Sequence, residues 1–386
     1  MQKNDGLPKA AYTDPRFFDL ELRHIFSKTW AFAGLKEDVN NPGDFITVQA
    51  GLNNIIVIMG RDHRLRAFHN MCRHRGTQLL TAQGKDKKLL TCPYHDWTYD
   101  IEGQLISIPK QQQEFGEVNK QCLNLKAAKV DVWRGMIWVH ADPEAEAITH
   151  WFNGIDPYLG PHKVEELIES KDSVVIENIQ ANWKLVVENY IDQYHLAQLH
   201  SGTLSMYDHA KAEFGFVGPH YLFWEPLVKE YADGLESKSL LPLIDNIPKE
   251  KLGAWVPMLF PNIGLGESES SWSVFHVIPI AVDKTKVVIR TKVMNSSSMS
   301  FLKQGVKSLG YWSSSIKAKY DDHSSKHPLG SADFMQEDIY VCEQQQKSLA
   351  SPYFELGPSA LKGEQPIRDF QKVVWRYIQP HWKTEE

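Results

Sequence analysis

Two short segments within the first hundred residues supply paired metal ligands. Cys72-Arg-His74 is followed, after seventeen residues, by Cys92-Pro-Tyr-His95. Each segment offers one thiolate and one imidazole. When one iron of a [2Fe-2S] cluster binds two Cys and the other binds two His, the neutral imidazoles raise the reduction potential above that of an all-Cys cluster. The pattern therefore predicts a site that accepts one electron and passes it on.

Structural zinc is the alternative interpretation, because Cys and His also make tetrahedral zinc sites. A Cys2His2 finger places its two Cys together and its two His together, whereas here the types alternate, which favours a Rieske-type [2Fe-2S] cluster. Strand-like runs flank both loops, at 54–59, 65–70, 88–91, 97–99 and 105–108. We expect both loops at hairpin ends of a small β-domain.

Composition limits the class of protein. The 386 residues carry 42 basic and 48 acidic side chains with no basic block, which disfavours nucleic acid as a partner. No run reaches the 18 or so apolar residues of a membrane span, and the first residues lack the apolar core of a signal peptide, so we expect a soluble cytoplasmic protein.

Cysteine content bears on the supply of electrons. Cys122 and Cys342 are the only cysteines outside the two loops, and we interpret them as isolated thiols. The chain lacks the four further Cys of a plant-type ferredoxin and a G-x-G-x-x-G fingerprint for a flavin or nicotinamide cofactor. Reducing equivalents must therefore come from a separate protein.

A second group of ligands lies within one predicted helix, 182–200. At about 100° per residue, Glu188, Asp192 and His195 fall within roughly 60° of one another, but His200 lies about 140° from His195. The helix must therefore bulge or break before both imidazoles can bind one ion. Two His and one carboxylate on one face of an iron leave three positions for oxygen and substrate. Glu188, Asp192 or a distant residue could supply that carboxylate.

The alternative for this segment is a core His195 and a surface His200, without metal. Coexistence with the Cys-His loops favours iron, because an electron carrier in a chain this large needs an electron acceptor. Together, C-x-H-x17-C-x2-H at 72–95 and E-N-x2-D-x2-H-x4-H at 188–200 resemble the catalytic α-subunit of Rieske non-haem iron ring-hydroxylating oxygenases.

This resemblance implies roles for further residues. Asp192 would be a bridge that joins His195 to the cluster ligand His95 of the next subunit, and Asn189 would lie near the iron. The third iron ligand would be Asp338, from a late helix. Glu337 is its rival, adjacent in sequence but pointing about 100° away on a helix.

The fold class implied is α+β, with an all-β Rieske domain joined to a helix-grip catalytic domain. We expect an N-terminal helix and entry segment at 1–41 that packs on the catalytic body, the Rieske domain at 42–145 and the mononuclear iron domain at 146–386. Helices are predicted at 15–30, 150–159, 164–169, 301–320, 333–349 and 367–378. The family also implies a head-to-tail homotrimer, in which each cluster lies against the next catalytic domain.

The predicted function is that of a terminal oxygenase. It would use O2 and electrons from a separate NAD(P)H-linked reductase, directly or through a ferredoxin, to hydroxylate an aromatic acid or ring compound. A quaternary amine of the choline, betaine or carnitine type is the alternative substrate. A Rieske electron carrier without mononuclear iron and a zinc-stapled binding module are alternatives of other classes. Candidate pocket liners are the aromatic residues Phe214, Phe216, Tyr221, Phe223, Trp224, Trp255, Phe260 and Trp272.

Overall fold

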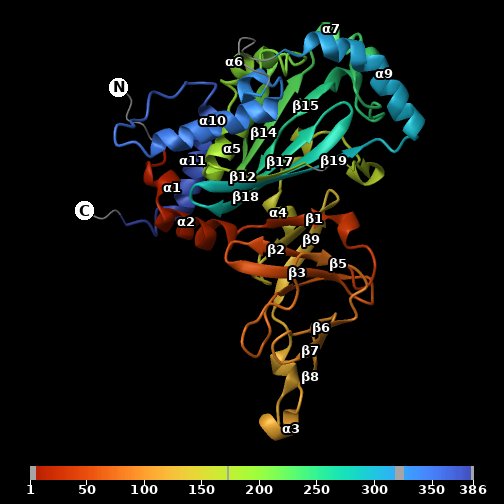
Figure 1. The fold of residues 1–386 in the computed structure, drawn as a ribbon, viewed down its shortest axis with the longest axis vertical. Helices are drawn as coiled ribbons and strands as arrows, with labels where there is room; N and C mark the ends of the chain where they lie inside the picture. The colour runs from red at the N-terminus through yellow and green to blue at the C-terminus, as the bar shows by residue number, and fades with distance from the viewer. Residues whose placement is uncertain (1–5, 172–173, 318–325, 384–386) are drawn as a thin grey trace. The chain divides into compact units, whose positions relative to one another are not determined.

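The computed structural model describes residues 6–171, 174–317 and 326–383, and it divides the chain into two units (Figure 1). The smaller unit is Asp19–Asn153, and the larger unit joins Met1–Phe18 to Gly154–Glu386. The bounds given by the sequence, with a segment at 1–41 that packs on the catalytic body and domains at 42–145 and 146–386, stay a prediction.

The smaller unit is built from two antiparallel sheets. A seven-stranded sheet has the order β1-β10-β9-β4-β3-β2-β5, and a three-stranded sheet has the order β6-β7-β8. The strands are β1 (Ala31–Leu35), β2 (Phe45–Ala50), β3 (Asn53–Met59), β4 (Leu65–His69), β5 (Gln83–Gly84), β6 (Leu89–Thr91), β7 (Thr98–Asp100), β8 (Leu105–Ser107), β9 (Ala127–Trp133) and β10 (Met136–His140). Each strand-like run predicted around the two loops overlaps one of these strands.

Strand β3 separates two hydrophobic cores of the smaller unit. Its side chains alternate between the two faces of the sheet, so that Ile55 packs in one core and Ile56 in the other. The core on the Ile56 face also contains Cys72 and Cys92. The same apolar packing that stabilises this unit therefore holds the two Cys in place.

The larger unit contains a nine-stranded antiparallel sheet. Its main order is β11-β19-β18-β17-β15-β14-β13, while β12 pairs with β19 and β16 pairs with β14 and β17. The strands are β11 (Ile168–Glu169), β12 (Val174–Ile179), β13 (Glu213–Val217), β14 (His220–Pro226), β15 (Gly253–Trp255), β16 (Met258–Leu259), β17 (Ile263–Glu267), β18 (Ser271–Ala281) and β19 (Lys284–Val293).

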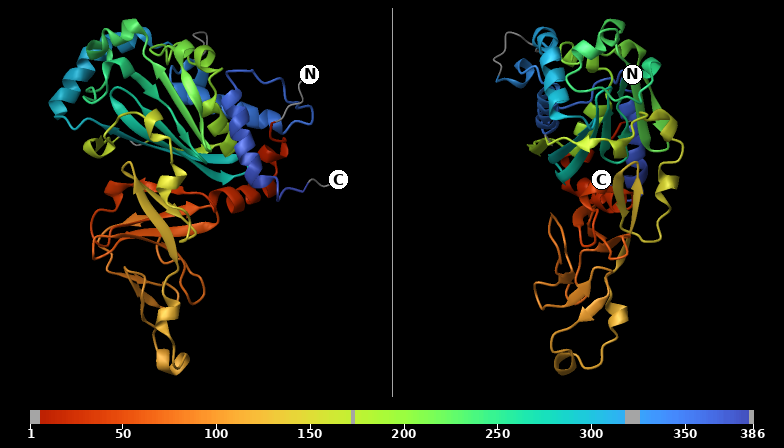
Figure 2. Two further views of the ribbon diagram at one scale, coloured as in Figure 1. Left: turned by 180° about the vertical axis from the view of Figure 1, so that it is seen from behind. Right: turned by 90° about the vertical axis from the view of Figure 1, so that its right-hand side faces the viewer.

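Helices cover one face of this sheet. Helix α5 packs on β18 and β19, and α10 and α11 pack on α5 (Figures 1 and 2). The α-helices are α1 (Ala10–Thr13), α2 (Pro15–Glu21), α3 (Gln111–Glu114), α4 (Ile148–Trp151), α5 (Trp183–Ile191), α6 (Leu196–Leu199), α7 (Lys229–Ala232), α8 (Leu235–Lys238), α9 (Ser298–Ser315), α10 (Phe334–Leu349) and α11 (Gln365–Ile378). Side chains cap the starts of two of these helices: Asn182 accepts a hydrogen bond from the Lys184 amide at α5, and Asp333 accepts one from the Met335 amide at α10.

Four predicted helices differ from the structure. The predicted helix at 15–30 is α2 up to Glu21, followed by a π-helix at Leu22–Phe26. The 150–159 region holds only the end of α4 and a 3-10 turn at Asp156–Tyr158, and 164–169 is a 3-10 turn at Val164–Glu166 followed by β11. Pairing of Ile168 with Val293 of β19 draws the latter segment into the sheet. Helix α9 is shorter than the predicted 301–320, and positions 318–320 lie outside the described residues. No helix in the described part of the chain is long and apolar enough to cross a bilayer.

Candidate metal centres

The two Cys-His loops of the smaller unit have matching backbone turns. The Gly76 amide donates a hydrogen bond to the Cys72 carbonyl oxygen, and the Asp96 amide donates one to that of Cys92, each at 3.0 Å. Gly76 and Asp96 both have positive φ, 80° and 56°, a conformation that Gly and Asp adopt more readily than most residues. One type of turn is thus used twice, and each turn carries its His.

The four donor side chains are grouped by type. His74 Nδ1 and His95 Nδ1 face each other at 3.1 Å, while both Cys are buried in the core, each 2 % exposed. The indole of Trp97 stacks on the His74 ring, with centroids 4.9 Å apart. Two inner sulfurs and two outer nitrogens are the arrangement that a cluster with one Cys-bound and one His-bound iron requires.

Tyr99 supports the sulfur side of this group. Its hydroxyl lies 3.5 Å from Cys72 Sγ and accepts a hydrogen bond from the Arg73 amide at 2.9 Å. Burial raises the pKa of the Cys72 thiol, although the Tyr99 hydroxyl opposes the rise. A buried thiolate is stable only with a cation beside it, and a thiolate that binds a metal ion has such a cation. The residues present therefore fit a [2Fe-2S] cluster.

In the larger unit, the predicted helix is interrupted before His195, whereas the sequence argument placed the bulge or break between His195 and His200. Helix α5 ends at Ile191, and Asp192 is extended, with φ −74° and ψ 122°. A four-residue helix, α6, follows, with His195 just before it and His200 just after it. The short helix between them carries both imidazoles to one place, where His195 Nε2 lies 3.2 Å from His200 Nε2.

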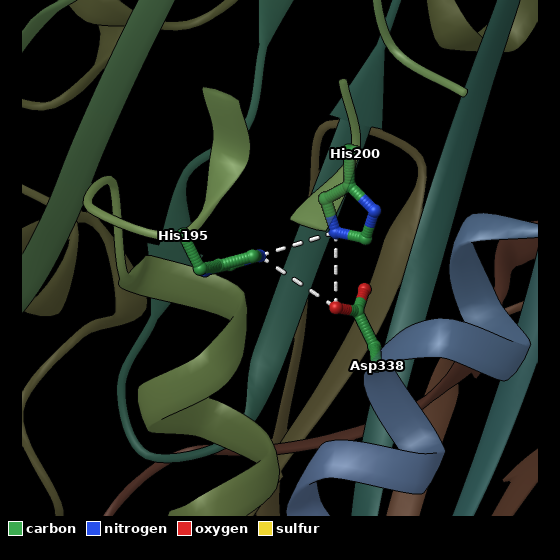
Figure 3. Close-up of side chains that lie close together, drawn as sticks. All are labelled: His195, His200 and Asp338. Atoms are coloured by element: carbon green, nitrogen blue, oxygen red, sulfur yellow. Dashed lines mark hydrogen bonds and ion pairs between the residues drawn. The ribbon is translucent and has the colours of Figure 1, made fainter. Parts of the chain in front are cut away.

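Helix α10 contributes two adjacent carboxylates to the His200 ring. Glu337 Oε2 lies 2.8 Å from Nδ1, and Asp338 Oδ1 lies 3.0 Å from Nε2. Asp338 Oδ1 is also 3.6 Å from His195 Nε2, which completes a triangle of three donor atoms (Figure 3). Glu337 faces the opposite edge of the ring and is outside this triangle.

The triangle fits a metal ion. His195, His200 and Asp338 are the group of three among the described residues whose donor atoms could hold one ion. Ligands about 2.1 Å from a metal and at right angles to one another lie about 3 Å apart. The three observed separations, 3.0, 3.2 and 3.6 Å, match one face of such a coordination sphere.

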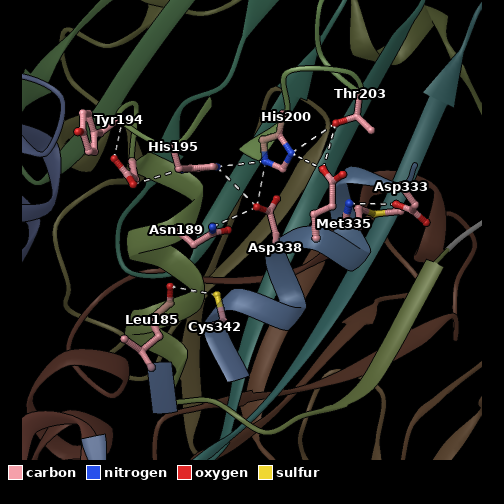
Figure 4. A network of polar contacts seen from close by, with 12 residues as sticks. Leu185, Asn189, Tyr194, His195, His200, Thr203, Asp333, Met335, Asp338 and Cys342 are labelled. Atoms are coloured by element: carbon pink, nitrogen blue, oxygen red, sulfur yellow. Dashed lines mark hydrogen bonds and ion pairs between the residues drawn. The ribbon is translucent and has the colours of Figure 1, made fainter. Parts of the chain in front are cut away.

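Further side chains orient the three donors (Figure 4). Asp192 Oδ2 lies 3.3 Å from His195 Nδ1, and its other oxygen accepts a hydrogen bond from the Tyr194 amide at 2.7 Å. The Asn189 amide donates a hydrogen bond to Asp338 Oδ1 at 3.1 Å. Carboxylates and amides in such positions fix the tautomer and orientation of metal-binding groups. Asp192 and Asn189 are therefore part of the same cluster as the triangle.

Glu188, the other sequence candidate for the carboxylate, lies elsewhere. Its Oε1 accepts hydrogen bonds from the Tyr12 hydroxyl at 2.6 Å and the Gln371 amide at 3.0 Å.

The two carboxylates of α10 also change the pKa of the His200 ring. Burial by itself would lower this pKa, but hydrogen bonds and charges from Asp338 and Glu337 outweigh burial and raise it. This environment favours a cation at the ring, and a divalent metal supplies one.

A cavity of about 420 Å³ opens beside the triangle. Of the aromatic liners predicted from sequence, Tyr221 and Phe223 line it. Phe214, Phe216, Trp224 and Trp255 instead line a second cavity of about 360 Å³, and Phe223 borders both. Alternate residues of β14 and β15 face opposite sides of the sheet, which separates the two sets. Phe260 and Trp272 are buried in the core.

Two family models match this chain. Residues 133–380 match the model of the ring hydroxylating alpha subunit (catalytic domain), and residues 29–129 match that of the Rieske [2Fe-2S] domain. The chain belongs to the family of ring-hydroxylating alpha subunits, whose members are mono- and dioxygenases. Membership confirms the predicted Rieske cluster, mononuclear iron, and fold of a β Rieske domain with a helix-grip catalytic domain.

Individual proteins show the same relationship. The chain is 38 % identical over 205 residues to the glycine betaine monooxygenase oxygenase subunit of Chromohalobacter salexigens, covering 53 % of this chain and 45 % of that one. It is 36 % identical over 198 residues to the large oxygenase component of the naphthalene 1,2-dioxygenase system of Pseudomonas fluorescens, covering 50 % and 43 %. The chain thus matches about half the length of these relatives.

Among solved structures, a quaternary ammonium Rieske monooxygenase that oxidises carnitine has the same fold. Its TM-score is 0.75 at 23 % identity, over 96 % of this chain and 95 % of that chain.

Proposed function

We propose that this protein is a terminal oxygenase that inserts oxygen from O2 into a quaternary amine. A separate NAD(P)H-linked reductase, directly or through a ferredoxin, would supply the electrons. The observation that carries the proposal is the triangle of His195, His200 and Asp338 donor atoms beside a cavity, in a chain that also has a Rieske domain.

In this proposal His195, His200 and Asp338 bind the mononuclear iron, and Cys72, Cys92, His74 and His95 bind the cluster. An Fe(II) held by two His and one carboxylate keeps three positions for oxygen and substrate, and a Rieske cluster stores one electron. The chain's own residues would orient these groups: Asp192 Oδ2 lies 3.3 Å from His195 Nδ1, Glu337 contacts His200 Nδ1, and the Asn189 amide donates a hydrogen bond to the Asp338 carboxylate.

Asp192 would have a second role between subunits. Its Oδ2 already lies beside His195 Nδ1, and it has a side-chain exposure of 16 %. We propose that it also hydrogen-bonds His95 of a neighbouring copy in a head-to-tail trimer, because His95 is exposed at the tip of its loop. The solved structure of the carnitine-oxidising monooxygenase gives insight into inter-subunit electron transfer, which supports this arrangement.

Charge supports an amine over an aromatic acid as substrate. Neither Lys nor Arg occurs among the described residues that line the cavity, whereas Asp192, Glu225, Glu267 and Asp338 do. An acid substrate would bring an anion into this lining without a cationic partner, at a desolvation cost. The similarity to glycine betaine monooxygenase points in the same direction.

Metal analysis and turnover test this proposal. Purified under anaerobic, iron-replete conditions, the protein should contain about three irons and two acid-labile sulfides per chain, and with a compatible reductase it should couple NADH and O2 consumption to oxidation of a trimethylammonium compound. Two irons per chain without oxygenation would instead identify a Rieske electron carrier. A zinc-filled, EPR-silent protein would identify a zinc-stapled module.

A further inference from the structure

The cavity contains a buried carboxylate outside the metal centre, Glu225. Tyr221, Phe223 and Glu225 alternate along β14, so all three side chains face the cavity. Glu225 is 4 % exposed. A carboxylate on a largely apolar wall costs free energy unless a partner compensates its charge, so its contacts decide what it can bind.

The partner of Glu225 within the chain is His209, whose Nδ1 lies 2.7 Å from Glu225 Oε2. A ring N–H at this distance donates to the carboxylate oxygen and orients it. Among the described residues, Glu225 Oε1 makes no hydrogen bond. One oxygen is thus oriented by His209, and the other is available to a ligand.

The other carboxylates of the lining are already engaged. Glu267 Oε2 accepts a hydrogen bond from the Gly160 amide at 2.6 Å, and Oε1 accepts one from the Trp272 indole at 3.1 Å. Asp192 and Asp338 contact His195 and His200 in the metal centre. Glu225 is the carboxylate of the described lining that remains for a substrate.

Aromatic rings complete the surroundings of Glu225. Tyr207, Tyr221 and Phe223 line the same cavity. Burial raises the pKa of both tyrosines, and the charge of Glu225 adds to the rise, so both phenols stay neutral. Neutral rings attract a quaternary ammonium group through their faces, and a carboxylate in a site shielded from water strengthens that attraction.

We propose that Glu225, with the rings of Tyr207, Tyr221 and Phe223, binds the ammonium group of the substrate, and that the preferred ligands are quaternary ammonium compounds without a carboxylate. Glu225 determines specificity, and His209 positions it. A substrate carboxylate would meet the charge of Glu225 while finding no Lys or Arg in the described lining. This inference rests on the proposed function, but it selects against the acid-bearing amines that some relatives oxidise.

Binding to the anaerobic holoenzyme tests the inference without turnover. Isothermal titration would compare choline, its neutral carbon isostere 3,3-dimethylbutan-1-ol, and glycine betaine. We expect choline to bind about tenfold or more tightly than either of the others. In Glu225→Gln the preference for choline over the neutral isostere should fall to near unity, whereas Glu225→Asp, which keeps the charge, should retain part of it.

Glu213→Gln is the matched control. Glu213 lies on the neighbouring strand β13, is exposed and lines the second cavity, so its loss should leave all three affinities unchanged. Iron content and absorbance of each variant would establish folding. Tighter binding of betaine than of choline, or a cation preference unaffected in Glu225→Gln, would overturn the inference while the amine oxygenase stands. If the enzyme oxygenated arenes and no quaternary amine, the proposed function would be wrong as well as the inference.

Discussion

The contact between Glu337 and His200 leads to a quantitative prediction for iron affinity. Glu337 is fully buried, and its Oε2 accepts hydrogen bonds from His200 Nδ1 at 2.8 Å and the Thr203 hydroxyl at 3.1 Å. Its Oε1 has no hydrogen-bond partner among the described residues. The carboxylate therefore acts mainly on His200: it fixes the tautomer that leaves Nε2 free for metal and makes that nitrogen more basic.

Two substitutions separate these effects. Glu337→Gln keeps an acceptor of the same shape but removes the charge, whereas Glu337→Leu removes both. Loss of such an outer contact lowers metal affinity about 10- to 100-fold, or about 1.4 to 2.7 kcal/mol. We expect the Gln variant near the lower limit and the Leu variant near the upper one, because only Leu leaves the His200 N–H without an acceptor.

The assay is anaerobic titration of Fe(II) into protein whose mononuclear site has been emptied, with cluster absorbance as the check of integrity. Glu343→Gln, on the same helix, is the control, because its Oε1 accepts a hydrogen bond from the Gln180 amide, away from the triangle. The reasoning would be refuted if both Glu337 variants bound Fe(II) within twofold of the wild type.

Other positions give further predictions. Asp338→Ala should remove mononuclear iron and spare the cluster; loss of iron from Glu337→Ala alone, with Asp338→Ala unaffected, would reverse the assignment of the ligand. Asp192→Ala should leave both centres occupied yet nearly abolish turnover, and normal turnover would reject the bridging role. Burial, aided by the charge of Lys286, lowers the pKa of His276 to about 4, below its usual 6.5. The unfolded chain therefore binds the extra proton first as pH falls, so stability should fall by about 1.4 kcal/mol per unit between pH 6.5 and 4, and urea denaturation of His276→Asn should lack this component.

Local spacing was enough to predict the cluster loops. Cys72 and His74 lie two residues apart, and Cys92 and His95 three, so each pair fits within one turn and needs only flanking strands to position it. An interruption of the second helix was also predicted, because two imidazoles about 140° apart on an ideal helix cannot bind one ion, but the structure has it before His195 and not between the two His. These features depend on backbone geometry over a few residues, which the sequence encodes directly.

Long-range packing decided the choice between carboxylates. From sequence, Glu188, Asp192 and the adjacent pair Glu337 and Asp338 were all plausible partners for the two His. Helix α10 packs against α5 and turns Asp338 toward Nε2 and Glu337 toward Nδ1 of one ring. The proposed ligand Asp338 and its neighbour Glu337, which contacts the other nitrogen of His200, are adjacent on α10. Only the docking of α10 against α5 decides which of the two carboxylates faces the two His.

The cavity wall was the least predictable part. Aromatic residues between 214 and 272 had no pattern that separated liners from core, and the pairing of His209 with Glu225 joins positions on different elements. The sequence by itself predicted the two Cys-His loops and the His195 and His200 pair, because each of these groups is short and local. The tertiary structure decided which side of the sheet each aromatic residue faces and which carboxylates the metal centre uses, since these depend on strand register and on the docking of α10 against α5, more than a hundred residues away.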